Sequence, residues 1–291
     1  MKENVRIAFN SGNTSWDQLS KIFNKYNLLE LLHEGPSSIS MYSFVIPIDS
    51  DYLLGLRKEI QLISPTFLER IERNYTNTEL QQFPLLWFTL STAEKGFGGP
   101  WFGTRYDLSG ACEVCGAGGR QEGPLHLSRR EIPKKNQIFQ TMGHEYLVNA
   151  EIAEALTAAG LKGLELRRAV SEKGERDPLD WWQLIAGYVM PPMSKKLTGF
   201  ARERPCPHCN RDGWFASNKV PDEPLYDSSS IQLEKLPDAV VTWECFGNSG
   251  IKPDFTKSNI AHGLMLVTPK VMDVFRKLKV RSVRFAPVRI E

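Results

Sequence analysis

The chain has 291 residues, 41% of them hydrophobic, and it carries 36 Lys and Arg against 34 Asp and Glu. This length and composition suffice for one large or two smaller apolar cores, which excludes disorder for most of the chain. The formal net charge of +2 is too small to indicate attraction to nucleic acid or to an anionic membrane.

The sequence shows neither a secretory leader nor a membrane span. The first residues lack the apolar segment of a signal peptide. No apolar run reaches the roughly 18–20 residues that a transmembrane helix needs. We therefore expect a soluble, cytoplasmic protein with no membrane partner.

The N-terminal part of the sequence predicts a small α/β domain. An alternating strand at 5–9 precedes a helix over 16–32, for which Ser15 is the expected N-cap. A second strand is expected at 41–48, and apolar residues at helical spacing predict a second helix over 65–75. Together these elements predict an accessory domain.

A polar stretch at 74–82 separates this domain from the rest of the chain. A buried strand is expected directly after it, at 84–90. We therefore predict two domains, an N-terminal accessory α/β domain over residues 1–80 and a second domain over residues 81–291.

Two segments of the second domain resemble each other. Residues 144–170 can be laid on residues 263–289 without a gap, and their apolar positions coincide. Each segment predicts a strand, a helix and a second strand, with Asn149 and Thr268 as the N-cap residues of the helices. Gly160 suits the end of the first helix. We interpret the pair as an internal duplication of one β-α-β unit.

The five cysteines carry the strongest functional signal. Four of them form two C-x-x-C pairs, Cys112 with Cys115 and Cys206 with Cys209, whereas Cys245 stands alone. Such a turn brings two sulfurs to one point and leaves backbone N–H groups free to donate to thiolates. Two pairs that meet in the fold would supply the four soft ligands that tetrahedral zinc requires.

The residues around the two pairs fit zinc knuckles. A left-handed residue commonly follows the second cysteine, and Gly116 and Asn210 hold those places. His208, inside the second turn, is expected to point away from the metal, and Cys245 is expected to be a small buried hydrophobe. The two pairs are farther apart than in an ordinary zinc ribbon, so reduced metal-free turns and a redox pair remain as alternatives.

We predict one structural zinc ion held by four thiolates, those of Cys112, Cys115, Cys206 and Cys209. Four protein ligands close the coordination sphere, so such a metal would stabilise the fold and would not catalyse a reaction. The expected fold is α+β, with the accessory α/β domain followed by a zinc-ribbon-like unit that contains the two similar β-α-β segments.

Several pieces of the second domain resemble the bacterial double-CXXCG motif proteins known from myxobacteria. The matching pieces are the knuckle at 112–118, the segment at 145–166, the second knuckle and the closing segment at 271–287. The resemblance covers roughly residues 84–291 and leaves the N-terminal domain outside it. Some members of that family are regarded as immunity proteins that neutralise toxins delivered between neighbouring bacteria. The resemblance therefore implies a zinc-binding protein whose partner is a cognate toxin.

No catalytic residue is predicted. His144 and Glu145 are not followed by the second histidine of a zincin motif, and no Gly-x-Ser-x-Gly elbow occurs. His126 and His262, like His144, are expected to be structural. The predicted function is thus a non-enzymatic, zinc-binding protein-interaction module, an immunity protein that binds and neutralises its toxin.

The alternative prediction is a zinc-ribbon protein that binds nucleic acid. Basic and aromatic residues flank the second knuckle, namely Arg202, Arg204, Arg211, Trp214 and Phe215. A second basic run comprises Arg276, Lys277, Lys279, Arg281 and Arg284. Such a run on a helix and strand is usually a solvated face, and the balanced total charge favours the protein-binding alternative.

Overall fold

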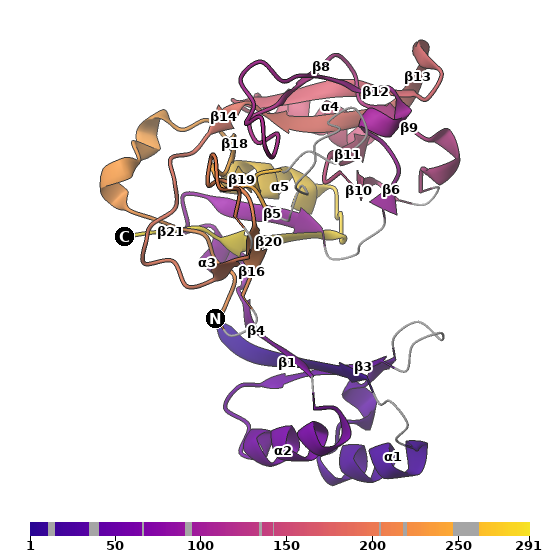
Figure 1. Ribbon diagram of the computed structural model, residues 1–291, viewed down its shortest axis with the longest axis vertical. Coiled ribbons are helices and arrows are strands. Elements are labelled where there is room, and N and C mark those ends of the chain that lie inside the picture. Colours follow the sequence, from indigo (N-terminus) through magenta and orange to yellow (C-terminus); the bar gives the residue numbers. More distant parts are fainter. Residues whose placement is uncertain are drawn as a thin grey trace. The chain divides into compact units, whose positions relative to one another are not determined.

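The structure is a computed structural model of residues 1–291. It describes the whole chain except residues 11–14, 35–40, 66, 91–94, 134–135, 142, 204, 218–219 and 247–261. Helices and strands occur together, which confirms the expected α+β class. The chain divides into two units, Met1–Glu79 with Ala216–Asp222, and Leu80–Phe215 with Glu223–Glu291; Figure 1 labels most of their elements.

The first unit is a β-α-β-β-α-β fold. Its elements are β1 (Lys2–Asn10), α1 (Trp16–Lys25), a short 3₁₀ helix (Leu29–Leu31), β2 (His33–Glu34), β3 (Met41–Pro47), α2 (Leu53–Ile63) and β4 (Leu68–Asn74). The strands form an antiparallel sheet in the order β2-β3-β1-β4, which is the ferredoxin-like arrangement. Both helices cover one face of this sheet (Figure 1).

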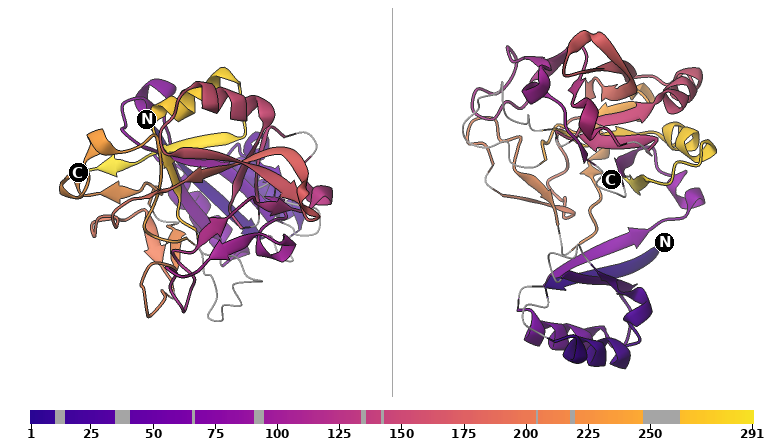
Figure 2. Two further views of the ribbon diagram at one scale, coloured as in Figure 1. Left: turned by 90° about the horizontal axis from the view of Figure 1, so that it is seen from above. Right: turned by 90° about the vertical axis from the view of Figure 1, so that its right-hand side faces the viewer.

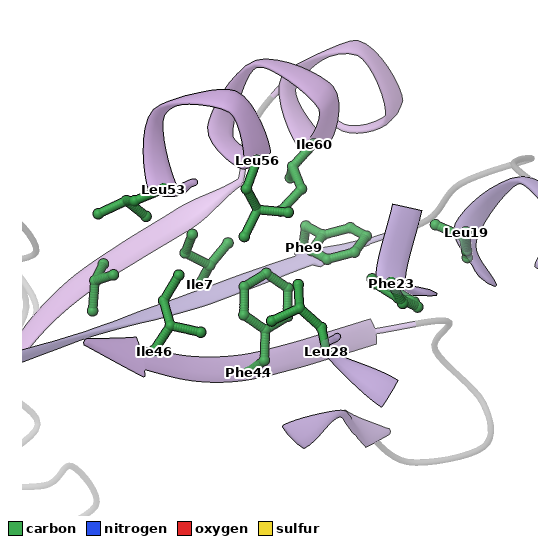
Figure 3. Close-up of a cluster of buried hydrophobic side chains, with 11 residues drawn as sticks. Ile7, Phe9, Leu19, Phe23, Leu28, Phe44, Ile46, Leu53, Leu56 and Ile60 are labelled. Carbon is green, nitrogen blue, oxygen red and sulfur yellow. The ribbon is translucent and has the colours of Figure 1, made fainter. Parts of the chain in front are cut away.

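The core of the first unit lies between that face and the helices (Figure 3). Alternate residues of the two central strands point into it, because side chains alternate across a strand. The buried set is Val5, Ile7, Phe9, Leu19, Phe23, Leu28, Phe44, Ile46, Leu53, Leu56 and Ile60. Each large apolar side chain that is fully buried contributes about 1.5–3 kcal/mol of transfer free energy.

The helix predicted over 65–75 is wrong, and the second helix lies earlier, at α2. Residues 68–74 form the edge strand β4, whose pairing is supported by charged side chains. Arg6 of β1 pairs with Glu72 at 2.8 Å, and Arg73 pairs with Glu3 at 2.7 Å. The first predicted helix is also shorter than expected. It ends at Lys25, since Asn27 takes a left-handed φ of 54°.

α3 (Asn77–Leu80) spans the boundary between the two units, and the second unit continues as two halves, residues 86–171 and 174–290. The first half contains β5 (Leu86–Leu90), β6 (Lys95–Gly96), β7 (Arg105–Asp107), β8 (Arg120–Glu122), β9 (His126–Leu127), β10 (Ile138–Thr141), β11 (Tyr146–Asn149), α4 (Ala150–Ala158) and β12 (Leu164–Ser171). The second half contains β13 (Gly174–Ala186), β14 (Tyr188–Val189), β15 (Phe200–Arg202), β16 (Trp214–Ala216), β17 (Leu225–Tyr226), β18 (Ala239–Val241), β19 (Met265–Val267), α5 (Pro269–Lys277), β20 (Val283–Pro287) and β21 (Arg289–Ile290). Short 3₁₀ helices lie at Pro100–Phe102, Arg129–Glu131, Ser228–Ser230 and Leu233–Lys235.

The two halves carry equivalent elements in the same order. Their sheets run β6-β10-β11-β13-β12-β9 and β14-β18-β19-β5-β20, and each half adds a two-stranded sheet, β7-β8 or β15-β16. In the first half, the short strand β9 pairs in parallel with the end of β12. In the second half, the equivalent strand β17 pairs in parallel with β21, which follows β20. The similarity thus extends well beyond the two segments that sequence comparison aligns.

The leading strands of the two halves are exchanged. β5 begins the first half but lies between β19 and β20, and β13 begins the second half but lies between β11 and β12. The exchanged strands pair in equivalent registers. Leu164 of β12 pairs with Ala186 of β13, and Val283 of β20, which aligns with Leu164, pairs with Leu90 of β5. Each β-α-β segment is therefore split by an antiparallel strand that comes from the other half.

The helices of the two segments begin and end as the sequence indicates. The Asn149 side chain accepts a hydrogen bond from the backbone N–H of Ile152 at 3.1 Å, and Thr268 is the N-cap residue of α5. Past the helix ends, Gly160 and its aligned counterpart Lys279 both have positive φ, 61° and 55°. The expected strand–helix–strand order is present in both segments.

The two halves meet through their helices and aromatic side chains. α4 and α5 pack against each other (Figure 2). The Tyr146 hydroxyl donates to the backbone carbonyl of Phe88 at 3.2 Å, and the two rings meet edge-on with centroids 4.9 Å apart. Phe88 also contacts Phe275 and Phe285, so the aromatic core extends across both sheets.

A buried carboxylate, that of Asp238, ties the loop after α4 to the N-terminus of α5. It accepts hydrogen bonds from the backbone N–H of Lys162 and from the Thr268 hydroxyl, each at 2.9 Å. Burial opposes its ionisation, but these hydrogen bonds and the Lys270 ammonium outweigh burial and lower the pKa of Asp238. The ionised form therefore stabilises the junction of the two halves.

Candidate metal centre

Each C-x-x-C turn lies between the strands of a small two-stranded sheet, the first between β7 and β8 and the second between β15 and β16. The two turns share one backbone conformation. Gly116 donates to the carbonyl of Cys112 at 2.7 Å, and Asn210 donates to the carbonyl of Cys206 at 3.1 Å. Gly116 and Asn210 have φ of 73° and 62°, which confirms the left-handed conformation expected after each pair.

The structure brings all four cysteine sulfurs to one place. The Sγ atoms of Cys112 and Cys206 are 3.7 Å apart, those of Cys115 and Cys209 are 3.4 Å apart, and all four lie within 4.8 Å of one another. A tetrahedron with metal–sulfur bonds of about 2.3 Å places its sulfurs about 3.8 Å apart. The group can therefore hold a metal ion, with each cysteine of one half facing its equivalent in the other.

Three of the four ligand candidates are buried, and only Cys209 is partly exposed. Burial opposes ionisation of Cys112, but the backbone N–H groups of Cys115 and Val114 outweigh it and lower the pKa of Cys112 to about 7. Burial raises the pKa of Cys115 and of Cys209. Without a metal, the site therefore favours the thiol form of Cys115 and Cys209, and a bound cation would have to displace their protons.

The surroundings of the second turn contain a residue that sequence reasoning missed. Asp212 is 3% exposed, and its carboxylate accepts the backbone N–H of Cys206 at 2.5 Å. Asp212 thus fixes the start of the turn. Its position three residues after Cys209 is the only sequence signal for this role.

Cys245 belongs to the same buried cluster but not to the four-sulfur group. Burial raises the pKa of Cys245 to about 12, so this residue stays a thiol at neutral pH. No disulfide involves any of the five cysteines. His208 is exposed, in keeping with a side chain that lies away from the sulfurs.

A cavity of about 640 Å³ lies beside the first turn. His144 and His262 both line it, with ring centroids 6.0 Å apart, whereas His126 lies elsewhere. The Tyr106 hydroxyl donates to the buried Glu145 carboxylate at 3.2 Å, and burial together with this charge raises the pKa of Tyr106. The sequence did not indicate that residues so far apart would meet. The hydrogen bond between Tyr106 and Glu145 positions the loop between β10 and β11.

The basic residues near the second turn are engaged by the protein itself. The Arg202 guanidinium lies over the Trp214 ring, 5.0 Å from its centroid, and donates to Asn210. Arg211 lies over Trp243 at 5.3 Å and donates to its carbonyl at 2.9 Å. One face of each tryptophan ring is therefore occupied by an arginine. Arg204 lies outside the described residues.

No protein-family model matches this sequence, and the comparison with curated proteins also finds no match. Among the helices that the structure describes, none is long and apolar enough to cross a membrane. The resemblance to double-CXXCG motif proteins therefore stays a prediction.

Proposed function

We propose that this protein binds one structural zinc ion through Cys112, Cys115, Cys206 and Cys209, and that it acts as a non-catalytic protein-binding module. The observation that carries the metal site is the meeting of four sulfurs within 4.8 Å on two turns of the same conformation. Four thiolates are soft ligands, which favour zinc or iron over magnesium or calcium.

The role proposed for zinc is to link the two small sheets that carry the turns. Four cysteine ligands leave no coordination position for water or substrate, so the metal has no means to activate either. The backbone N–H groups that lower the pKa of Cys112 would stabilise a metal-bound thiolate in the same way. The site is thus suited to a structural role.

Elemental analysis of freshly purified protein tests this site. We expect one zinc per chain and no absorption in the visible range, whereas an iron–tetrathiolate centre would be coloured. Less than half an equivalent of zinc, in protein purified without chelators, would remove the site.

We further propose that the bound partner is a toxin and that this protein is its immunity protein. The support is the resemblance of residues 84–291 to double-CXXCG motif proteins. The engaged arginines near the second turn give nucleic acid less support. The test is growth of cells that express the toxin encoded next to this gene, with and without this protein. Unchanged killing by every neighbouring toxin would contradict the proposal.

A further inference from the structure

Small side chains on α4 leave a groove between this helix and the sheet of the first half. The groove has a volume of about 400 Å³. It is lined by Ala150, Ala153, Glu154, Thr157 and Ala158 of α4, by Leu166 of β12 and by Trp182 of β13. Leu166 and Trp182 are half-buried, and Glu154 and Thr157 are exposed. The groove therefore offers an apolar base with one carboxylate at its side.

The second half provides a comparison built into the same chain. In the gapless alignment, Ala153 corresponds to Met272, and Thr157 corresponds to Arg276. Strand register gives the counterpart of Trp182. Val148 pairs with Trp182, and Val267, which aligns with Val148, pairs with Leu86, so Trp182 corresponds to Leu86. Met272 and Leu86 are both fully buried. On the helix, the large Met272 thus occupies the position that is Ala153 in α4, whereas on the strand the larger side chain is Trp182 of the first half's sheet.

The equivalent face of α5 is also covered by a short segment of this chain. Leu80, the last residue of α3, is 4% exposed. The next residue, Gln81, donates its side-chain amide to the Asp273 carboxylate of α5 at 2.6 Å. Asp273 is the aligned counterpart of Glu154, so this contact lies where the groove lies in the first half.

In the part of the chain that the structure describes, the segment that leads into β13 gives α4 no equivalent cover. β5 is preceded by α3, but the residues that lead into the central part of β13 pair with the end of β12 instead. In that hairpin Val170 faces Pro178, and Ser171 faces Gly174. The segment that could have covered α4 is therefore used elsewhere in the fold.

We propose that the groove on α4 is the docking site for a short helical segment of a partner protein, one that presents a large apolar side chain followed by an amide or ammonium donor. This inference rests on the protein-binding function proposed above and assigns it a surface. The apolar side chain takes the space left by Ala153 and Thr157, and the donor binds Glu154 as Gln81 binds Asp273.

Charge and connectivity give two other occupants less support. The Glu154 carboxylate repels the phosphates of a nucleic acid, and the Arg168 guanidinium over the Trp182 ring is already paired with Asp180. A second copy of this chain is less suited, since its own Leu80 is already buried and its Gln81 side chain already bonds Asp273 of α5. A partner with a free segment of the same chemistry remains.

A peptide copy of the chain's own covering segment, residues 74–84, serves as the probe. The full-length protein is titrated with this peptide, and the Trp182 indole and the α4 amides are followed by NMR. We expect saturable shifts confined to α4 and Trp182, with a dissociation constant of roughly 1 mM or below, as befits one buried side chain and one polar contact. A peptide with Leu80→Ala is expected to bind about fivefold more weakly or worse.

Matched protein variants localise the binding. Ala153→Met fills the groove as Met272 does in the other half, and we expect it to weaken peptide binding at least about fivefold. Ala159→Met, an exposed position outside the groove, is the control and leaves binding unchanged. Glu154→Lys replaces an exposed side chain, so it keeps the fold and removes the acceptor. No shifts in α4 at several millimolar peptide, or equal binding by Ala153→Met and wild type, would overturn the proposal.

The same variants separate this inference from the immunity function. If the protein neutralises a toxin and Ala153→Met binds that toxin as tightly as wild type, the docking site is wrong and the immunity function stands. If no neighbouring toxin is neutralised but the peptide binds the groove, the immunity function fails and the docking site stands.

Discussion

The division of the cysteines into four ligands and one bystander can be tested with two chemically identical substitutions, Cys209→Ser and Cys245→Ser. Cys209 is partly exposed, and Cys245 is 3% exposed within an apolar cluster. Its thiol lies 4.0 Å from the carbonyl of Trp243, at the outer limit of a sulfur hydrogen bond. Burying a serine hydroxyl at position 245 is therefore expected to cost about 1–3 kcal/mol, whether or not zinc is present.

The effect of Cys209→Ser depends on the metal instead. With free zinc at about 1,000 times its dissociation constant, binding adds about 4 kcal/mol to the free energy of unfolding. Losing one of four ligands removes most of this contribution. In the presence of a chelator, the more exposed Cys209 is expected to tolerate serine better than Cys245 does. The order of the two variants should thus reverse when zinc is removed.

Urea unfolding followed by tryptophan fluorescence measures this reversal, because six of the seven tryptophans lie in the second unit. Zinc content is determined on the same samples. We expect about one equivalent in wild type and in Cys245→Ser, and much less in Cys209→Ser. The reasoning is refuted if the two variants keep the same order with and without zinc, or if Cys245→Ser loses its zinc.

Three further predictions follow from individual contacts. Burial raises the pKa of Cys115 and of Cys209, so zinc must displace protons from these thiols. Zinc affinity should therefore rise with pH, and calorimetry in two buffers should show proton release. A zinc affinity that does not change with pH would contradict this prediction. Lys279→Gly should raise the free energy of unfolding by about 1 kcal/mol and Gly160→Ala should lower it by about as much, since both positions have positive φ; thermal unfolding that shows the opposite signs would be inconsistent with the conformation. Asp238→Asn should destabilise the protein by about 1–3 kcal/mol at pH 7, and this cost should vanish as acid protonates the wild-type carboxyl through its lowered pKa; a cost that persists in acid would show that the charge is unimportant.

The features that the sequence predicted are those that depend on a few neighbouring residues. The left-handed residues after both cysteine pairs follow from the turn itself, and Asn149 and Thr268 were recognisable as N-caps beside periodic apolar residues. The prediction of a helix over 65–75 was wrong because it rested on the spacing of apolar residues alone. Its charged residues pair across a sheet with Arg6 and Glu3, and those partners are remote in sequence.

The features that the sequence did not predict depend on contacts between distant segments. Comparison of residues 144–170 with 263–289 indicated two β-α-β segments but not that each is split by a strand of the other half. Strand exchange leaves no local pattern, since a buried strand has the same composition in either sheet. Asp212 was missed for a similar reason, because its role depends on the backbone of Cys206 across the turn.

The exchange of β5 and β13 limits what the metal has to do. Each of the two large sheets of the second unit contains strands from both halves, so unfolding either half removes a central strand from the other. The halves are therefore held together by backbone pairing and by the Tyr146–Phe88 contact even without a metal. The four cysteines lie on the turns within the small sheets β7-β8 and β15-β16, and among the described residues these sheets make no strand pairs with the large ones. A metal at this site would thus fix the two turns relative to each other, and this local effect fits the structural, non-catalytic role proposed above.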